Sequence, residues 1–215
     1  MLALYGHPFS SYTWKALIPL YAYEIPFEFR MVDPDHPENT AVVQSAGPAG
    51  KFPVLDDDGA LIFEATTIIE HLARKHPEAD LLPTDPKAAI AMRQMDRVFD
   101  NYVMNVMQIA VNEYLRDAAN PDLATLDDMR ARLSKTYAWI DRWLADYPLD
   151  GRITLIECAA APSLFYADWV HAIPKDLARL GAFRAHLLAL PAIKRCVDDA
   201  RPYRKFFPLG APDRD

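Results

Sequence analysis

The stretch from Gly47 to Thr67 constrains the fold of this 215-residue chain more than any other. It opens with a loop rich in glycine and proline. Pro53 stands where an apolar strand begins, a place suited to a residue that cannot donate to a ladder, and the tight approach before it favours a cis peptide. The run Asp56–Gly59 predicts a hairpin turn between strands at 54–56 and 60–63, because Asp-Gly suits the positive φ angles of a type I′ turn.

The residues before this stretch predict a β-α-β unit. Leu2–Tyr5 is a short apolar run stopped by glycine, which predicts a buried strand. Ser10-Ser11 then begins a helix, because serine oxygens accept from first-turn amides. Pro19 predicts a kink or an early end of that helix. Phe27–Val32 alternates with period two and reads as the next strand, and a short helix is expected at 38–45.

The rest of the chain reads as helical. Apolar spacing predicts helices over residues 86–117, 123–147, 175–188 and 191–199. Another should begin at Thr154, where Thr154–Glu157 has the form of a capping box. This helix is apolar on all sides and should be the buried centre of a second domain, and the tail after residue 201 should lie over the surface.

The pattern break at 81–85 predicts a linker. The expected fold class is an α/β thioredoxin-like N-terminal domain over 1–80, with the element order β-α-β-α-β-β-α, followed by an all-α domain over 86–215.

Composition excludes several classes of protein. The formal charge is −7 and no basic run exceeds two residues, which disfavours a nucleic-acid partner. No apolar stretch has the length and freedom from charge of a membrane span, and the N-terminus has no signal-peptide pattern. Cys158 and Cys196 lie far apart on helical patterns, so we expect reduced, packed thiols in a cytoplasmic protein, with no disulfide and no metal site.

Ser10 and Ser11 are the candidate catalytic residues. A helix N-terminus offers free amides and partial positive charge, which favour an anion. A ligand thiol held there would ionise more readily, and a serine hydroxyl would stabilise the thiolate further. The segment Ser10–Thr13 has no sulfur of its own, so disulfide exchange by the protein is excluded. The alternative is that both serines only cap the helix.

Three features near the hairpin suggest a site for a peptide. Phe52-Pro53, if cis, would turn the Phe52 backbone outward, where an extended ligand can pair with it. Glu64 at a helix start would hold an ammonium beside free amides that suit a carboxylate, and Lys51 would add charge for a second carboxylate. The alternatives are a structural turn, a complement to the helix dipole, and a solvated lysine.

Together these segments resemble the glutathione S-transferase superfamily, of a serine-dependent, bacterial-like type. The resemblance covers the whole chain and is carried by Pro8–Ser11, Gly50–Leu55, Phe63–Leu72 and Thr154–Glu157. These segments are specific for the superfamily and do not assign a subclass.

The resemblance implies that Ser10 stabilises the glutathione thiolate, with Ser11 as second choice. The implied glutathione-binding residues are Ser11, Lys51, Phe52, Pro53, Glu64, Ala65 and Thr66. Ala65 departs from the family, which has serine or threonine there, so one hydroxyl contact to the ligand carboxylate is lost. Thr66 or a backbone amide could replace it. Tyr5, near the catalytic tyrosine of other subclasses, is interpreted as core.

A mostly apolar electrophile pocket is expected beside Ser10. The residues assigned to it are His7, Phe9, Tyr102, Val106 and Met107. Methionine and aromatic side chains would give an adaptable surface, although the same spacing also suits ordinary core packing. His7 would stand at the mouth of the cleft, or would simply be solvated.

The resulting expectation is a glutathione transferase for detoxification, a homodimer by resemblance, that adds the glutathione thiolate to small hydrophobic electrophiles. Glutathione is then a co-substrate. The alternatives are a glutathione-dependent isomerase, dehalogenase or peroxidase, and a non-catalytic ligand-binding protein of the same fold, which Ala65 favours.

Overall fold

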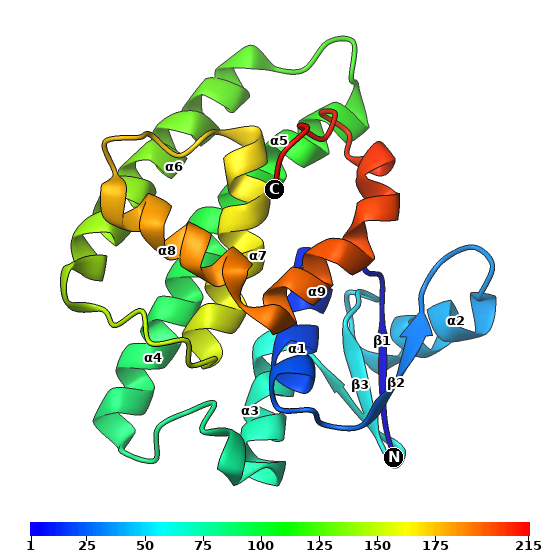
Figure 1. The fold of residues 1–215 in the computed structure, drawn as a ribbon. Helices are drawn as coiled ribbons and strands as arrows, with labels where there is room; N and C mark the ends of the chain where they lie inside the picture. Colours follow the sequence, from blue (N-terminus) through cyan, green and yellow to red (C-terminus); the bar gives the residue numbers. More distant parts are fainter.

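A four-stranded mixed sheet forms the first half of the computed structural model, which describes residues 1–215 (Figure 1). The strands are β1 (Leu2–Gly6), β2 (Phe27–Met31), β3 (Val54–Asp57) and β4 (Ala60–Phe63), in the spatial order β2-β1-β3-β4. β1 pairs in parallel with β2 and antiparallel with β3, which pairs antiparallel with β4. In this register Leu4 of β1 lies between Phe29 and Leu55.

The two faces of the sheet are covered by different helices. Leu2 and Leu4 belong to the large core that includes residues of α1 (Ser11–Ala22) and α3 (Ala65–Lys75). Ala3 and Tyr5 join a small cluster that reaches α2 (Pro37–Ala46). This alternation is the period of two that a strand imposes. The thioredoxin-like fold class of this half is therefore confirmed.

The hairpin and the loop before it follow the sequence predictions. Asp58 and Gly59 have φ angles of 51° and 95°, as a type I′ turn requires, and the Phe52–Pro53 peptide is cis. Of the kink or early end expected at Pro19, the early end is wrong, because α1 continues to Ala22, and the kink stays a prediction. The apolar neighbours of Pro19 are buried in the core, and this packing outweighs the hydrogen bond that proline cannot make.

The second half is helical, as expected. Its elements are η1 (Pro77–Ala79), α4 (Pro86–Val98), the π-helical segment η2 (Phe99–Met104), α5 (Asn105–Arg116), α6 (Leu123–Trp143), η3 (Leu144–Asp146), α7 (Leu155–Val170), α8 (Ala178–Ala189), α9 (Pro191–Ala200) and η4 (Arg201–Phe206). None of the helices combines the length and the apolar character that a membrane crossing requires. The exact domain boundary at 81–85 stays a prediction.

Helix α7 is the buried centre of this half, and α1 packs directly against it (Figure 1). The capping box at its start is confirmed: Thr154 caps the first turn, and the Glu157 carboxylate accepts from the Thr154 amide at 2.8 Å. Because α1 also covers the sheet, it is the element that joins the two halves of the molecule.

Candidate active site

The N-terminus of α1 is held in place from both sides. Ser10 is the N-cap, and its Oγ accepts from the Thr13 amide at 3.2 Å. The predicted capping role is therefore confirmed, and the Ser10 hydroxyl proton remains available for a second partner. The buried Trp14 donates its indole N–H to the Pro8 carbonyl at 2.6 Å, which fixes the loop that leads to Ser10.

A cavity of about 590 Å³ opens beside these serines. Ser10 and Ser11 lie on its wall with Phe9 and Met107, so the structure brings these expected residues together. Apolar side chains form more than half of the lining. The polar lining residues include the side-chain amides of Asn105, Gln108 and Asn112 on α5. Such a surface suits an apolar molecule with a few polar groups.

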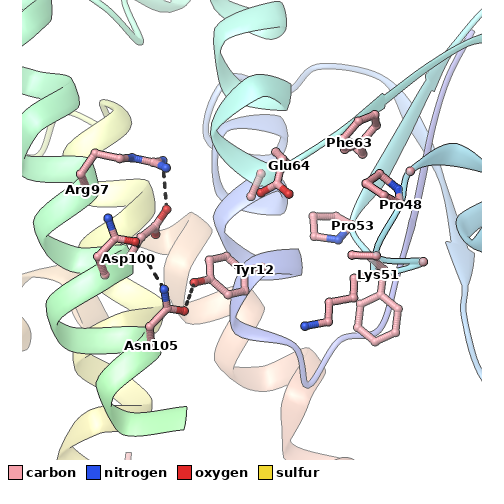
Figure 2. A pocket seen from close by; sticks show the side chains of 15 residues that line it. Tyr12, Pro48, Lys51, Pro53, Phe63, Glu64, Arg97, Asp100 and Asn105 are labelled. Carbon is pink, nitrogen blue, oxygen red and sulfur yellow. Dashed lines mark hydrogen bonds and ion pairs between the residues drawn. The ribbon is translucent and has the colours of Figure 1, made fainter. Parts of the chain in front are cut away.

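A second cavity, of about 310 Å³, adjoins the first and is more polar. Lys51, Phe52, Pro53, Glu64 and Ala65 line it, together with Arg97 and Asp100 from the helical half. The two cavities share Tyr12, Gly50, Lys51, Phe52 and Asn105 and are therefore continuous. Figure 2 shows the polar cavity lying between the Pro48–Pro53 loop and the helix that carries Arg97 and Asp100.

Glu64 stands at the start of α3 in an unusual backbone conformation. Its φ angle is 67°, a left-handed value that a non-glycine residue adopts at a cost of about 1–3 kcal/mol. No side chain caps the first turn of α3. The amides of this turn therefore stay open to a ligand anion, and the Glu64 carboxylate stands beside them for an ammonium group.

Phe52 presents the backbone that an extended peptide needs. It lies outside β3, and its amide and carbonyl make no hydrogen bond within the chain. A ligand backbone can pair with both groups in the manner of an added strand.

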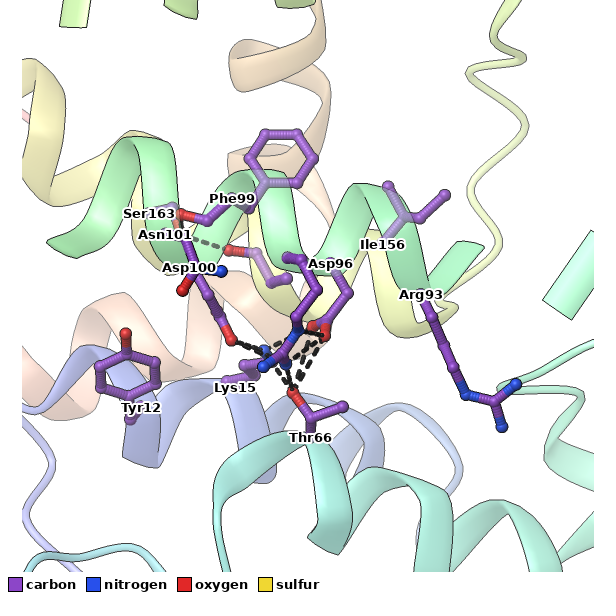
Figure 3. A network of polar contacts seen from close by, with 12 residues as sticks. Tyr12, Lys15, Thr66, Arg93, Asp96, Phe99, Asp100, Asn101, Ile156 and Ser163 are labelled. Carbon is purple, nitrogen blue, oxygen red and sulfur yellow. Dashed lines mark hydrogen bonds and ion pairs between the residues drawn. The ribbon is translucent and has the colours of Figure 1, made fainter. Parts of the chain in front are cut away.

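Beneath the polar cavity lies a cluster of charges that joins α1, α3, α4 and η2, and its members are buried or partly buried except for Arg97 (Figure 3). The ammonium of Lys15 contacts Asp96 Oδ1 at 2.5 Å, Asp100 Oδ2 at 2.7 Å and Thr66 Oγ1 at 2.9 Å. These three partners use all of its donors. Arg97 contacts both aspartates from the cavity side, at 3.0 Å for Asp100.

Burial raises the pKa of Asp100 above its ordinary value, although Lys15 and Arg97 act in the opposite direction. The carboxylate is thus ionised only at the cost of desolvation, which its two cations offset. We name this set (Lys15, Thr66, Asp96, Arg97 and Asp100) the charge cluster.

The structure does not bring four of the expected residues into the two cavities. Thr66 lies in the charge cluster, where its hydroxyl donates to Asp96 at 3.0 Å, so it does not replace the hydroxyl missing at Ala65. His7 packs edge-on against Tyr203 at 4.6 Å, and its Nδ1 accepts from the Phe9 amide, so it is not at the cleft mouth. Burial lowers its pKa.

Tyr102 and Val106 line a different cavity, between the α4–α5 segment and α6. They therefore do not line the cavity beside Ser10, where the sequence placed them. The helical spacing was correct, but the rotation of the helix about its axis directs these side chains away from Ser10 and leaves Met107 facing it.

Several cavity residues escaped the sequence analysis. Tyr12 lines both cavities and donates its hydroxyl to Asn105 Oδ1 at 3.0 Å (Figure 2). Tyr12 directly follows the two serines, and this position could have predicted that it lies at the site. Burial raises the pKa of Tyr12, so the hydroxyl stays protonated at neutral pH. Arg97 and the tail residues Phe206, Phe207 and Pro208 gave no sequence signal, because only the tertiary fold places them here.

The comparisons with known proteins agree with this geometry. Residues 4–80 match the family described as the N-terminal domain of glutathione S-transferase. A probable maleylacetoacetate isomerase of Caenorhabditis elegans is 36% identical over 83 residues, which cover 39% of each chain. Glutathione S-transferase 1 of Dianthus caryophyllus is 24% identical over 206 residues, covering 95% of this chain and 89% of the relative.

The chain also matches solved structures over its length. A glutathione S-transferase of Methylobacterium radiotolerans, crystallised with glutathione sulfonate, superposes with a TM-score of 0.76 at 26% identity, covering 91% of this chain and 94% of that one. The chain shares its architecture, a thioredoxin-like half followed by a helical half, with that glutathione S-transferase. Residues 4–80 thus match the N-terminal domain of the glutathione S-transferase family, and the chain as a whole has the fold of a solved glutathione S-transferase.

Proposed function

We propose that the protein is a glutathione transferase that joins the glutathione sulfur to a small hydrophobic electrophile. The observation that carries the proposal is the continuity of two unlike cavities at the N-terminus of α1. The polar cavity has the charges and free amides of an amino-acid receptor, and the apolar cavity has room for the second substrate. The reaction would form a carbon–sulfur bond as the thiolate attacks, and a leaving group or a shifted π electron pair would take up the charge.

In this proposal the chain supplies position and electrostatics. Free amides at the start of α1 and the Ser10 hydroxyl would hold the sulfur as a thiolate. The Phe52 backbone would pair with the cysteinyl unit, and Glu64 with the first turn of α3 would hold the γ-glutamyl group. Lys51 lines both cavities and would face a carboxylate of the peptide. Ser11 is the second candidate for contact with the sulfur.

The first experiment is binding to immobilised glutathione, with ultraviolet difference spectra of added glutathione near neutral pH. We expect retention and a thiolate absorption band. Retention without a band would favour a non-catalytic binding protein, and no retention would refute the proposal.

The matched pair Ser10→Ala and Ser11→Ala then tests the role of each serine. Loss of a hydrogen bond to a charged group costs about 1.5–3 kcal/mol, so Ser10→Ala should lower turnover about 10- to 100-fold. Glutathione affinity should change far less. Since Ser10 also caps α1, Ser10→Thr serves as the control that keeps cap and hydroxyl. If only Ser11→Ala abolished turnover, the roles would be reversed.

A glutathione-dependent isomerase is the second candidate. The match at 36% identity is to a protein named as a probable maleylacetoacetate isomerase, and two further relatives carry that enzyme's name. Parallel assays with a chloronitrobenzene, a hydroperoxide, a disulfide and a cis-enone substrate distinguish the reactions. Isomerisation of the enone without net consumption of glutathione would favour this candidate.

We also propose a cytoplasmic homodimer. Cys158 and Cys196 are buried free thiols, which suit a reducing compartment. Ile90, Tyr102 and Trp139 expose large apolar surfaces on α4, η2 and α6, beside the cavity between these helices. A second copy of the chain would cover them. Sedimentation of wild type against Trp139→Glu tests this, with dissociation of the variant expected.

A further inference from the structure

One wall of the apolar cavity comes from the far end of the chain. Phe206, Phe207 and Pro208 line this cavity together with Ser10 and Ser11. The Phe207 ring is buried against Trp169 of α7 at 5.2 Å and faces Phe9 at 6.4 Å. The tail expected on the surface therefore forms part of the site.

The Phe206 ring differs from its neighbour. Phe206 is 63% exposed as a residue although it lines the cavity, so part of its surface is free, while Lys205 Nζ lies over its ring at 5.1 Å from the centroid. With Phe9 and Phe207 it presents aromatic surface to whatever enters. Aromatic rings attract one another in offset or edge-to-face geometry, so this wall favours a second substrate that itself carries an aromatic ring.

Beyond Pro208 the chain turns back on itself. The Gly210 amide donates to the Phe207 carbonyl at 2.9 Å, and Gly210 has a φ angle of 78°. Leu209 and Ala211 are only partly buried where they meet the core. The red end of the ribbon in Figure 1 follows this return. Such a segment frays unless it is tied down.

Two charged side chains, Arg214 and Asp215, hold this segment in place through ion pairs. Arg214 forms an ion pair with Asp168 of α7 and donates to the Asp168 carbonyl at 2.9 Å. Asp215 binds Arg201 at 2.5 Å and also contacts Arg204, both of which belong to η4. These charges thus fasten residues 214–215 to α7 at one point and to η4 at another, in addition to the packing of Phe207 against Trp169.

Asp168 is a fixed anchor. It is buried, it accepts from the Ile173 amide at 2.8 Å, and Arg184 lies 3.4 Å from its Oδ2. Asp168 therefore keeps a cation and a hydrogen bond when Arg214 is removed, and the fold should tolerate that removal.

We propose that Arg214 is a positioning residue for the second-substrate cavity: it ties residues 206–215 to Asp168 and so holds the aromatic wall that selects aryl electrophiles. The proposal rests on the proposed function for its substrate class, but the anchoring itself does not. The ion pair between Arg214 and Asp168 lies outside the cavity, so Arg214 affects the substrate only by holding residues 206–215 in place.

The experiment compares wild type, Arg214→Ala and Arg214→Lys with the control Arg130→Ala. Arg130 is an ion-paired arginine of equal side-chain exposure, 45% against 44%, which contacts Asp127 on α6. Amide hydrogen exchange of residues 206–215 is the readout of anchoring. Steady-state kinetics with chlorodinitrobenzene and with a small aliphatic electrophile, such as an alkyl halide, are the readout of selection.

In Arg214→Ala we expect faster exchange in 206–215 with α7 unchanged. KM for the aryl substrate should rise about fivefold, whereas kcat and the glutathione KM should change less than twofold. Arg214→Lys should restore part of both effects, and Arg130→Ala should match wild type.

Unchanged exchange in Arg214→Ala would refute the anchoring. Faster exchange with unchanged aryl KM, or an equal rise for the alkyl substrate, would refute the selective wall. A wild type without glutathione-dependent turnover would refute the proposed function and the substrate class, while the exchange data would still decide the anchoring.

Discussion

The sharpest test of the energetics is the substitution Lys15→Met. Methionine keeps the length and apolar stem of the side chain but removes the ammonium that contacts Asp96 and Asp100. Breaking a buried ion pair by removing one partner costs about 3–5 kcal/mol, because a desolvated charge is left behind. Arg97 still contacts both aspartates, so we expect the lower end, about 3 kcal/mol.

Thermal unfolding is the first assay. For a chain of this size a change of 1 kcal/mol shifts Tm by about 2–4 °C, so the expected loss is about 6–12 °C. The control is Lys87→Met on the exposed side of α4, which should stay within about 0.5 kcal/mol of wild type.

The pH dependence of the variant is the more specific assay. Burial already raises the pKa of Asp100 in the folded protein, and Lys15 is the first of the charges that lower it. Without Lys15 that pKa should rise further. A carboxyl with a raised folded pKa contributes stability that is present below its unfolded pKa and is lost as pH rises through its folded pKa.

The deficit of Lys15→Met should therefore shrink as the pH falls from about 7 toward 5. Adding Asp100→Asn to the variant should recover part of the lost stability at neutral pH, because the uncompensated charge is then absent. A deficit of less than 2 °C, or one of equal size at both pH values, would show that the charge cluster does not work as described.

Further predictions concern the cleft and α7. Ala65→Ser should tighten glutathione binding about tenfold, measured by calorimetry, since a hydroxyl bond to a carboxylate gains about 1.5 kcal/mol; unchanged affinity would show that the backbone of α3 suffices. Tyr12→Phe removes the bond to Asn105 and should alter KM for both substrates while the free energy of unfolding changes by less than about 1 kcal/mol; unaltered KM values would make Tyr12 a passive wall. Thr154→Ala should cost about 1–2 kcal/mol in denaturant unfolding, because Glu157 loses the hydroxyl and the first turn of α7 loses its cap; a neutral result would contradict the capping-box account.

The sequence predicted best what depends on neighbouring residues. The cap at Ser10, the turn at Asp58–Gly59 and the box at Thr154–Glu157 are interactions over two or three residues, and each has a local physical cause. The order of the elements followed from the same local patterns. These features together place the loop before α1 next to the hairpin, which was enough to expect a site there.

The predictions that failed concern the direction in which a side chain points once the helices have packed together. Thr66 stands one residue from the cavity, but helical geometry turns its hydroxyl toward α4. Tyr102 and Met107 both fit a helical stripe, and only the packing of the helix decides which of them faces Ser10. Lys15 interrupts an apolar helix face without any local sign that two aspartates some 80 residues away would surround it. Phe207 reaches the site from the other end of the chain for the same reason.

Helix α1 carries the terminus beside which a ligand would rest, and it also carries Trp14 and Lys15, which lie in the contact between the two halves. Hinged separation of the halves would strip both side chains of their partners in the helical half, which are Asp96 and Asp100 for Lys15 and Phe165 for Trp14. Substrates must therefore enter through movements of side chains and of short rim segments. A scattering profile recorded with and without glutathione should show the same radius of gyration.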